Sequence, residues 1–184
     1  GGSGAAGSHN DYYNRPAEPT SGTIWTEDGY ILTTWFNVSG EVKKITVTTH
    51  DGKEFVAQRL GYDEQRDVAL LKIEAKNLQV LPKAKMDEVK QGDFVAIIGR
   101  SPSKEVATIN QGVLSATGRM KGTAVQTDAE LNYGNVGGPL VNLAGELVGV
   151  TCQIKPRTNR GQSGGVGFAC KHPEIDKALP EDAI

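Results

Sequence analysis

Short apolar and β-branched runs separated by turn residues recur along most of the chain. Val68–Ile73 is almost continuously apolar, which is typical of a strand buried on both faces. Asp28-Gly29 and Asp51-Gly52 each separate two such runs and predict tight hairpin turns. The other runs that we interpret as strands are Thr23–Trp25, Tyr30–Phe36, Lys44–Thr49, Glu54–Leu60, Phe94–Gly99, Thr108–Ala116, Ala124–Thr127, Pro139–Leu143, Glu146–Gln153 and Gly165–Cys170.

One segment, Pro173–Leu179, has a helical pattern instead. Pro173 is compatible with the first turn of a helix, and Ile175, Ala178 and Leu179 supply an apolar side. Strands that recur about every 8–12 residues without helices between them favour a β-sandwich or a β-barrel. We therefore predict an all-β fold with a short C-terminal helix.

The first 21 residues differ in composition from the rest of the chain. Gly1–Ser8 is rich in glycine and small residues, and we interpret it as a linker and cloning remnant. His9–Ser21 is polar and contains two prolines, as expected of an extended arm. Two adjacent aromatic residues in this arm, Tyr12 and Tyr13, belong either to a partly ordered tail or to an oligomer contact. We expect residues 22–184 to form the folded domain.

Charge and hydropathy exclude several classes of function. The chain has 20 basic and 22 acidic residues, a net charge of -2, which gives no electrostatic reason to expect binding to nucleic acid or an anionic membrane. No run approaches the roughly 18 apolar residues that a membrane-spanning helix requires. The two cysteines do not make a disulfide framework, and no CxxC or HxxxH spacing predicts a metal site. We therefore expect no cofactor and no bound metal.

The segment Leu131–Leu140, with the sequence LNYGNVGGPL, carries the most specific motif. Glycines in such a loop let backbone N–H groups approach a ligand without obstruction by a Cβ atom. The segment resembles GNSGGPL, the nucleophile motif of the HtrA/Deg branch of the trypsin-like serine proteases. Further matches to that branch, in the same order along the chain, are Asp28–Thr33, Asp63–Ile73, Gly112–Ala116, Gln126–Asn142 and Gly165–Ala169. The resemblance implies two six-stranded antiparallel β-barrels with an active cleft between them.

The same resemblance assigns the three positions of a catalytic triad, two of which lack the required chemistry. Phe36 stands at the histidine position and Val136 at the serine position, while Asp67 matches the acid. Phenylalanine accepts no proton and valine has no hydroxyl with which to attack. Loss of either group costs on the order of 10⁶-fold in turnover in a subtilisin-type enzyme. We therefore predict that the chain is not an enzyme but a catalytically inactive pseudoprotease that acts as a protein-binding, peptide-binding or scaffolding module.

Backbone groups survive such substitutions. By resemblance, the loop Gly134-Asn135-Val136 is the remnant of an oxyanion hole, with the amides of Gly134 and Val136 as donors. This remnant is either open to an anion or carbonyl, or flipped and blocked, because Tyr133 replaces the usual proline. Asp67 must find other donors, and we expect backbone N–H groups near Phe36 and the hydroxyl of Thr151. The resemblance also predicts a peptide-binding cleft that is lined by Tyr133, Thr151, Cys152, Gln153, Gly167 and Phe168.

Three side features leave alternatives open. Cys152 and Cys170 are either buried free thiols or a cross-strand disulfide. The basic loop Lys155–Gly164 is either solvated or steers an acidic peptide. His50 and His172 are expected to be solvated at the surface. The alternative functions are a metal-binding or assembly factor on the same scaffold, and a protease with a non-standard nucleophile.

Expectations about partners and location come from the resemblance alone. They are a protein or peptide partner, for instance an active HtrA-type protease, and a homotrimer formed through the arm that contains Tyr12 and Tyr13. No PDZ domain is expected within this chain, because too few residues follow Leu179. HtrA proteins typically work outside the cytoplasm, so the resemblance implies an extracytoplasmic setting such as the bacterial periplasm.

Overall fold

The computed structural model describes residues 19–42, 44–100, 106–152 and 166–179. The N-terminal half is a five-stranded antiparallel sheet with the strand order β1-β2-β5-β4-β3. Its elements are β1 (Thr23–Ile24), β2 (Tyr30–Thr33), the helical turn α1 (Trp35–Val38), β3 (Ile45–Thr48), β4 (Glu54–Asp63) and β5 (Val68–Lys72).

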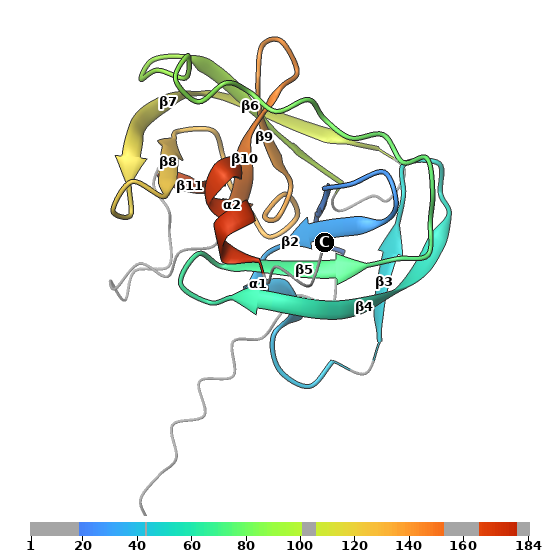
Figure 1. The fold of residues 1–184 in the computed structure, drawn as a ribbon. Helices are drawn as coiled ribbons and strands as arrows, with labels where there is room; N and C mark the ends of the chain where they lie inside the picture. The colour runs from blue at the N-terminus through green and yellow to red at the C-terminus, as the bar shows by residue number, and fades with distance from the viewer. Residues whose placement is uncertain (1–18, 43, 101–105, 153–165, 180–184) are drawn as a thin grey trace, which may run out of the picture.

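The C-terminal half is a closed barrel with the strand order β10-β11-β8-β7-β6-β9 (Figure 1). Its strands are β6 (Phe94–Gly99), β7 (Thr108–Arg119), β8 (Ala124–Thr127), β9 (Pro139–Asn142), β10 (Leu147–Cys152) and β11 (Gly167–Lys171). Alternate residues of β6 are buried, and the barrel is filled by side chains that are almost completely buried, among them Ile97, Leu114, Val125 and Leu140. Every residue of β10 is buried, because this strand is covered on both faces.

The helix α2 (His172–Ala178) follows β11 directly and lies where the two halves meet (Figure 1). Pro173 lies in its first turn, where a missing N–H is harmless. Ile175 packs into one apolar cluster with Leu70 of the half-barrel and Val150 of the closed barrel. This shared cluster fixes the relative position of the two halves, and with it the loops that face each other between them.

The predicted all-β fold with a C-terminal helix is confirmed, with two differences in detail. The N-terminal half is an open half-barrel, since the described residues show no ladder between its edge strands β1 and β3. The predicted strand Tyr30–Phe36 ends at Thr33, because the Thr34 side chain accepts a hydrogen bond from the Asn37 N–H at 3.1 Å and starts α1. Within the described part of the chain, no helix is long and apolar enough to cross a membrane.

Candidate functional site

The glycine loop Leu131–Gly138 lies against the N-terminal half of the molecule. Gly137 has φ +88°, a left-handed conformation that favours glycine, and a Cβ atom there would collide with the carbonyl oxygen of Ser21. A Cβ atom on Gly138 would collide with the carbonyl oxygen of Ile98 in β6. The two glycines therefore let the loop pass between Ser21 and the barrel wall, which places Val136 at the boundary of the two halves.

The two amides that the resemblance assigns to an oxyanion hole both have acceptors within the loop. The Gly134 N–H donates to Oδ1 of Asn132 at 2.8 Å. The Val136 N–H donates to the backbone carbonyl of Asn132 at 3.0 Å. A ligand carbonyl that used these donors would first have to displace Asn132. The blocked alternative is therefore the one that this conformation contains.

Side chains on both sides of the boundary hold the loop in this conformation. The Ser21 hydroxyl donates to the carbonyl of Gly134 at 2.6 Å, and the Thr23 hydroxyl donates to the carbonyl of Gly137 at 3.0 Å. Asn135 is buried, and its side chain accepts from the Asn132 N–H at 2.8 Å. The loop is therefore tied down at its backbone oxygens as well as at its amides.

Val136 fills a buried position in this frame. Its side chain is 2% exposed, and its carbonyl accepts from Nδ2 of Asn37 at 3.4 Å. Thr151 of β10 lies beneath the loop, where its hydroxyl accepts from the Gly137 N–H at 3.0 Å and donates to the Gly138 carbonyl at 2.9 Å. Thr151 therefore anchors the glycine loop, while the contact with Asp67 that we expected of it stays a prediction.

Asp67 is 8% exposed and has φ +53°, an uncommon conformation for a residue with a side chain. Its Oδ1 accepts a hydrogen bond from the backbone N–H of Phe36 at 2.9 Å. This N–H is one of the donors that we expected for a carboxylate without its histidine. The acid position and the base position of the resemblance are thus joined through a main-chain group.

Aromatic rings gather beside these groups. The rings of Phe36 and Tyr133 lie 6.4 Å apart, at an angle of 28°, so the glycine loop touches α1. Trp35, the neighbour of Phe36, stacks on Tyr62 of β4 at 3.8 Å. Tyr133 remains 52% exposed and Tyr62 54% exposed. Rings that are both stacked and exposed offer a rigid apolar surface to a ligand.

The predicted cleft residues of the closed barrel lie on neighbouring strands. Thr151 and Cys152 end β10, and Cys152 pairs with Phe168 of β11. Gly167 begins β11 and pairs with Thr127. Gln153, the basic loop Lys155–Gly164 and the tyrosines Tyr12 and Tyr13 lie outside the described residues, so these parts of the prediction stay predictions.

The cysteines are free thiols in buried positions, and the disulfide alternative is not formed. Burial raises the pKa of the Cys152 thiol well above its usual value. Burial also raises the pKa of Cys170 to about 12, against the opposing effect of Arg66. The thiolate is the nucleophilic form of cysteine, so neither residue is activated in this environment.

One histidine prediction is wrong. His50 is exposed, as expected, but His172 is 8% exposed and its Nε2 lies 2.6 Å from the carbonyl oxygen of Ala84. The reason is that His172 starts α2, and this end of the helix packs against the segment that contains Ala84. Across the residues that the structure describes, no group of three or more His, Cys, Asp or Glu side chains could hold a metal ion.

Sequence reasoning missed the residues that shape the glycine loop, above all Ser21, Asn37 and Asn132. Asn132 had a readable signal, because an asparagine two residues before a glycine often accepts the N–H of that glycine in an Asx turn. Ser21 and Asn37 had none, because their contacts with Gly134 and Val136 cross about a hundred residues of sequence.

Comparison with known proteins places this geometry in a family. The sequence pattern of the trypsin-like peptidase domain family matches residues 20–150. A probable periplasmic serine endoprotease, DegP-like, of Hahella chejuensis is 44% identical over 164 residues, which are 86% of this chain and 34% of that protein. The corresponding protein of Chlamydia muridarum is 40% identical over 161 residues, 84% of this chain and 32% of that protein.

A solved structure of the HtrA-type protease AlgW with a decapeptide has a TM-score of 0.74 and 35% identity. The match covers 86% of this chain and 49% of that chain. This chain spans about a third of the length of the curated relatives. The likeness therefore concerns one domain of longer proteins.

These comparisons contradict our prediction that the chain is not an enzyme. The prediction rested on two side chains, Val136 and Phe36, whereas relatives at about 40% identity are named serine endoproteases. The family is an enzyme family, and nothing in the comparisons shows a loss of activity.

Proposed function

The chain belongs to the trypsin-like peptidase family, in its HtrA/DegP branch, and from this premise we propose that it binds an extended protein or peptide segment beside Phe36, Tyr133 and Val136. The observation that carries the proposal is the pair of Phe36 and Tyr133, a ring contact between the two halves of which one ring is half exposed. A peptide that lies across the boundary would meet this surface first.

The chemistry of the surface favours an apolar side chain in the bound segment. Phe36 and Tyr133 present carbon-rich rings, and the buried residue of the neighbouring glycine loop, Val136, is apolar as well. Burial of apolar area contributes roughly 25 cal/mol per Å², so one large side chain held here would contribute about 1.5–3 kcal/mol to the binding of a short peptide. Proteases of this fold hold substrates as an added strand, and main-chain hydrogen bonds of that kind depend on no particular side chain.

The family supports our proposals for the partner and the compartment. The solved HtrA-type protease carries a decapeptide, which supports a peptide as the class of ligand. The curated relatives are named periplasmic, which supports an extracytoplasmic location for this chain as well. A protein partner of the same family, or a second copy joined through the N-terminal arm, is compatible with a binding role.

A second candidate is hydrolysis of the bound peptide, the activity for which the relatives are named. Val136 and Phe36 supply neither the usual attacking hydroxyl nor the usual base. Hydrolysis by this chain would therefore depend on groups other than these two side chains. The raised pKa values of Cys152 and Cys170 do not favour either thiol as a substitute.

One experiment separates the two candidates. Fluorescein-labelled unfolded casein is titrated with the protein, and binding is followed by fluorescence anisotropy while cleavage is followed on gels of the same samples. Saturable binding with intact casein supports the binding role, and cleavage that survives removal of contaminating protease supports hydrolysis. A flat anisotropy curve without cleavage contradicts both.

A further inference from the structure

The turn between β4 and β5 is organised by one carboxylate. Oδ1 of Asp63 accepts a hydrogen bond from the backbone N–H of Arg66 at 2.9 Å. Oδ2 of the same side chain pairs with Nη1 of Arg66 at 2.8 Å. Asp63 therefore binds both the main chain and the side chain of Arg66. A displacement of the guanidinium would therefore also shift the backbone of the turn.

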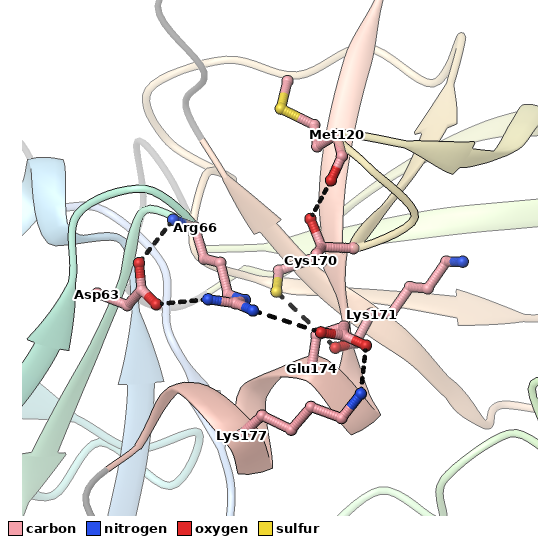
Figure 2. Close-up of polar contacts among 8 residues, drawn as sticks. Asp63, Arg66, Met120, Cys170, Lys171, Glu174 and Lys177 are labelled. Carbon is pink, nitrogen blue, oxygen red and sulfur yellow. Dashed lines mark hydrogen bonds and ion pairs between the residues drawn. The ribbon is translucent and has the colours of Figure 1, made fainter.

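The second Nη group of Arg66 reaches the C-terminal helix. Nη2 lies 3.5 Å from Oε2 of Glu174, whose other oxygen accepts from Nζ of Lys177 at 3.0 Å. Figure 2 shows Arg66 between Asp63 and Glu174, with Lys177 on the far side of Glu174. The side chains of Arg66, Asp63 and Glu174 are partly buried, with exposed fractions of 27%, 18% and 18%, so solvent screens these charges somewhat less than it screens a fully exposed ion pair.

The residue after Arg66 is Asp67, which has the uncommon left-handed φ of +53°. Such a conformation persists only where neighbouring residues hold the chain on both sides. Arg66 holds it on one side, and Val68, fully buried in β5, holds it on the other. The Asp67 carboxylate in turn accepts the backbone N–H of Phe36 at 2.9 Å. The ion pairs of Arg66 and the contact that places Phe36 are thus made by adjacent residues of the chain.

We propose that Arg66 and Glu174 are positioning residues that couple the helix α2 to the peptide-binding surface. When Glu174 holds Arg66, Asp67 stays in its left-handed conformation and keeps the Phe36 backbone in place. When that contact is lost, Asp67 relaxes and Phe36 moves relative to Tyr133. The functional meaning of the coupling rests on the proposed binding role of Phe36, whereas the coupling itself is a property of the free protein.

The test uses amide hydrogen exchange of the free protein, read by NMR, in three variants. Glu174→Gln removes the charge that faces Arg66 and keeps the shape of the side chain. Lys177→Gln is the matched control, because Lys177 contacts the same carboxylate from the same helix but lies opposite Arg66. Glu174→Asp keeps the charge on a shorter stem. The amide of Ile97 in the closed barrel serves as the internal reference.

We expect the Phe36 amide to exchange roughly tenfold faster in Glu174→Gln, while the Ile97 amide keeps its rate. Lys177→Gln should leave both rates unchanged, and Glu174→Asp should retain most of the Phe36 protection. Unchanged exchange at Phe36, or equal acceleration at Phe36 and Ile97, would overturn the coupling, because the ion pair would then be inert or a general stabiliser.

Two provisions keep the outcome decisive. If Glu174→Gln does not fold, Arg66→Lys is measured in the same way, since lysine keeps the charge but lacks the planar fork that reaches both carboxylates. No peptide is present in the exchange experiment. A protein that fails to bind casein but shows selective exchange at Phe36 therefore refutes the proposed function and leaves the coupling intact, and the reverse pattern refutes the coupling alone.

Discussion

The backbone N–H of Val136 donates a hydrogen bond to the backbone carbonyl oxygen of Asn132 at 3.0 Å. The Asn132 side chain takes up the Gly134 N–H as well, so one residue satisfies both donors that an oxyanion would otherwise use. Both N–H groups of this loop are therefore hydrogen-bonded within the loop itself. Whether these two donors are occupied or released decides whether the site can bind a carbonyl oxygen.

Replacement of Asn132 by alanine removes the acceptor of the Gly134 N–H. We expect a loss of about 1 kcal/mol in the free energy of unfolding and faster exchange of the Gly134 amide. Asn142→Ala is the matched control, because the Asn142 side chain accepts the N–H groups of Ala144 and Glu146 in the turn between β9 and β10 and none from the glycine loop. Urea denaturation should show similar losses for both variants, whereas only Asn132→Ala should change the exchange at Gly134.

A variant that carries histidine and serine at the two altered triad positions allows the donors of the same loop to be tested by a chemical reaction. In a Phe36→His/Val136→Ser variant, labelling by a serine-reactive phosphonate should be slow, because the two donors are held by Asn132. Asn132→Ala releases the Gly134 N–H but keeps the backbone carbonyl that accepts the Val136 N–H, so its addition should raise the labelling rate by about a hundredfold, the order of effect of one oxyanion-hole donor. Equal rates in the double and triple variants, measured by mass spectrometry on folded samples, would mean that the Asn132 side chain does not control the Gly134 donor.

The buried carboxylate of Asp67 is expected to act as an acceptor held in an unfavourable backbone conformation. Asp67→Ala should cost about 2–4 kcal/mol, since it removes the acceptor of the Phe36 N–H and keeps the left-handed φ. Asp67→Asn should cost only about 1 kcal/mol, because asparagine retains an acceptor oxygen and tolerates this conformation.

Asn77→Ala isolates the contribution of the backbone, as Asn77 is exposed and has a similar φ of +58°. Urea denaturation should therefore rank Asp67→Ala as clearly more destabilising than Asn77→Ala. A cost of Asp67→Ala no larger than that of Asn77→Ala would show that the contact with Phe36 contributes nothing.

Acidification should weaken the junction between the turn and α2. The hydrogen bond from Lys177, and then the contacts with Arg66, lower the pKa of Glu174 below its usual value of 4.5, against the opposing effect of burial. A carboxyl whose folded-state pKa is depressed stabilises the protein above its unfolded-state pKa, and this stabilisation is lost as the pH falls through the folded-state value. The free energy of unfolding should therefore decrease when the pH is lowered beyond about 4.5.

Glu174→Gln isolates the contribution of this carboxyl to the acid limb of stability. Glutamine does not titrate, so the variant should lose less stability than the wild type between about pH 5 and about pH 3. Parallel curves of unfolding free energy against pH for the two proteins would contradict a depressed pKa at Glu174.

Local patterns in the sequence specified much of the fold and part of the site. The apolar run Val68–Ile73 became the buried strand β5, and Pro173 marked the first turn of α2, because burial and backbone chemistry are decided within a few residues. The burial of His172 was not predictable, because it depends on Ala84, 88 positions away. The end of β2 at Thr33 was missed because a threonine cap competes locally with a β-branched run.

The site shows the same division. The motif located the glycine loop and the positions of Phe36, Asp67 and Val136, but it did not reveal that Asn132 takes up the amides of the loop. Inference from two side chains to the activity of the whole protein also failed, because the family is defined over the whole domain and its named members are endoproteases. Residue identity at a position limits the chemistry of that residue alone.

The most direct test of the binding surface compares two tyrosines of equal exposure. Tyr133 is 52% exposed and stacks on Phe36. Tyr62 is 54% exposed and stacks on Trp35, the residue next to Phe36 in α1. The two alanine variants therefore each remove one phenol ring that stacks on an aromatic residue of α1. With labelled casein as the ligand, we expect Tyr133→Ala to weaken binding about tenfold and Tyr62→Ala to change it less than about twofold. Equal affinities of the wild type and Tyr133→Ala would contradict the proposal that this ring contact forms the peptide-binding surface.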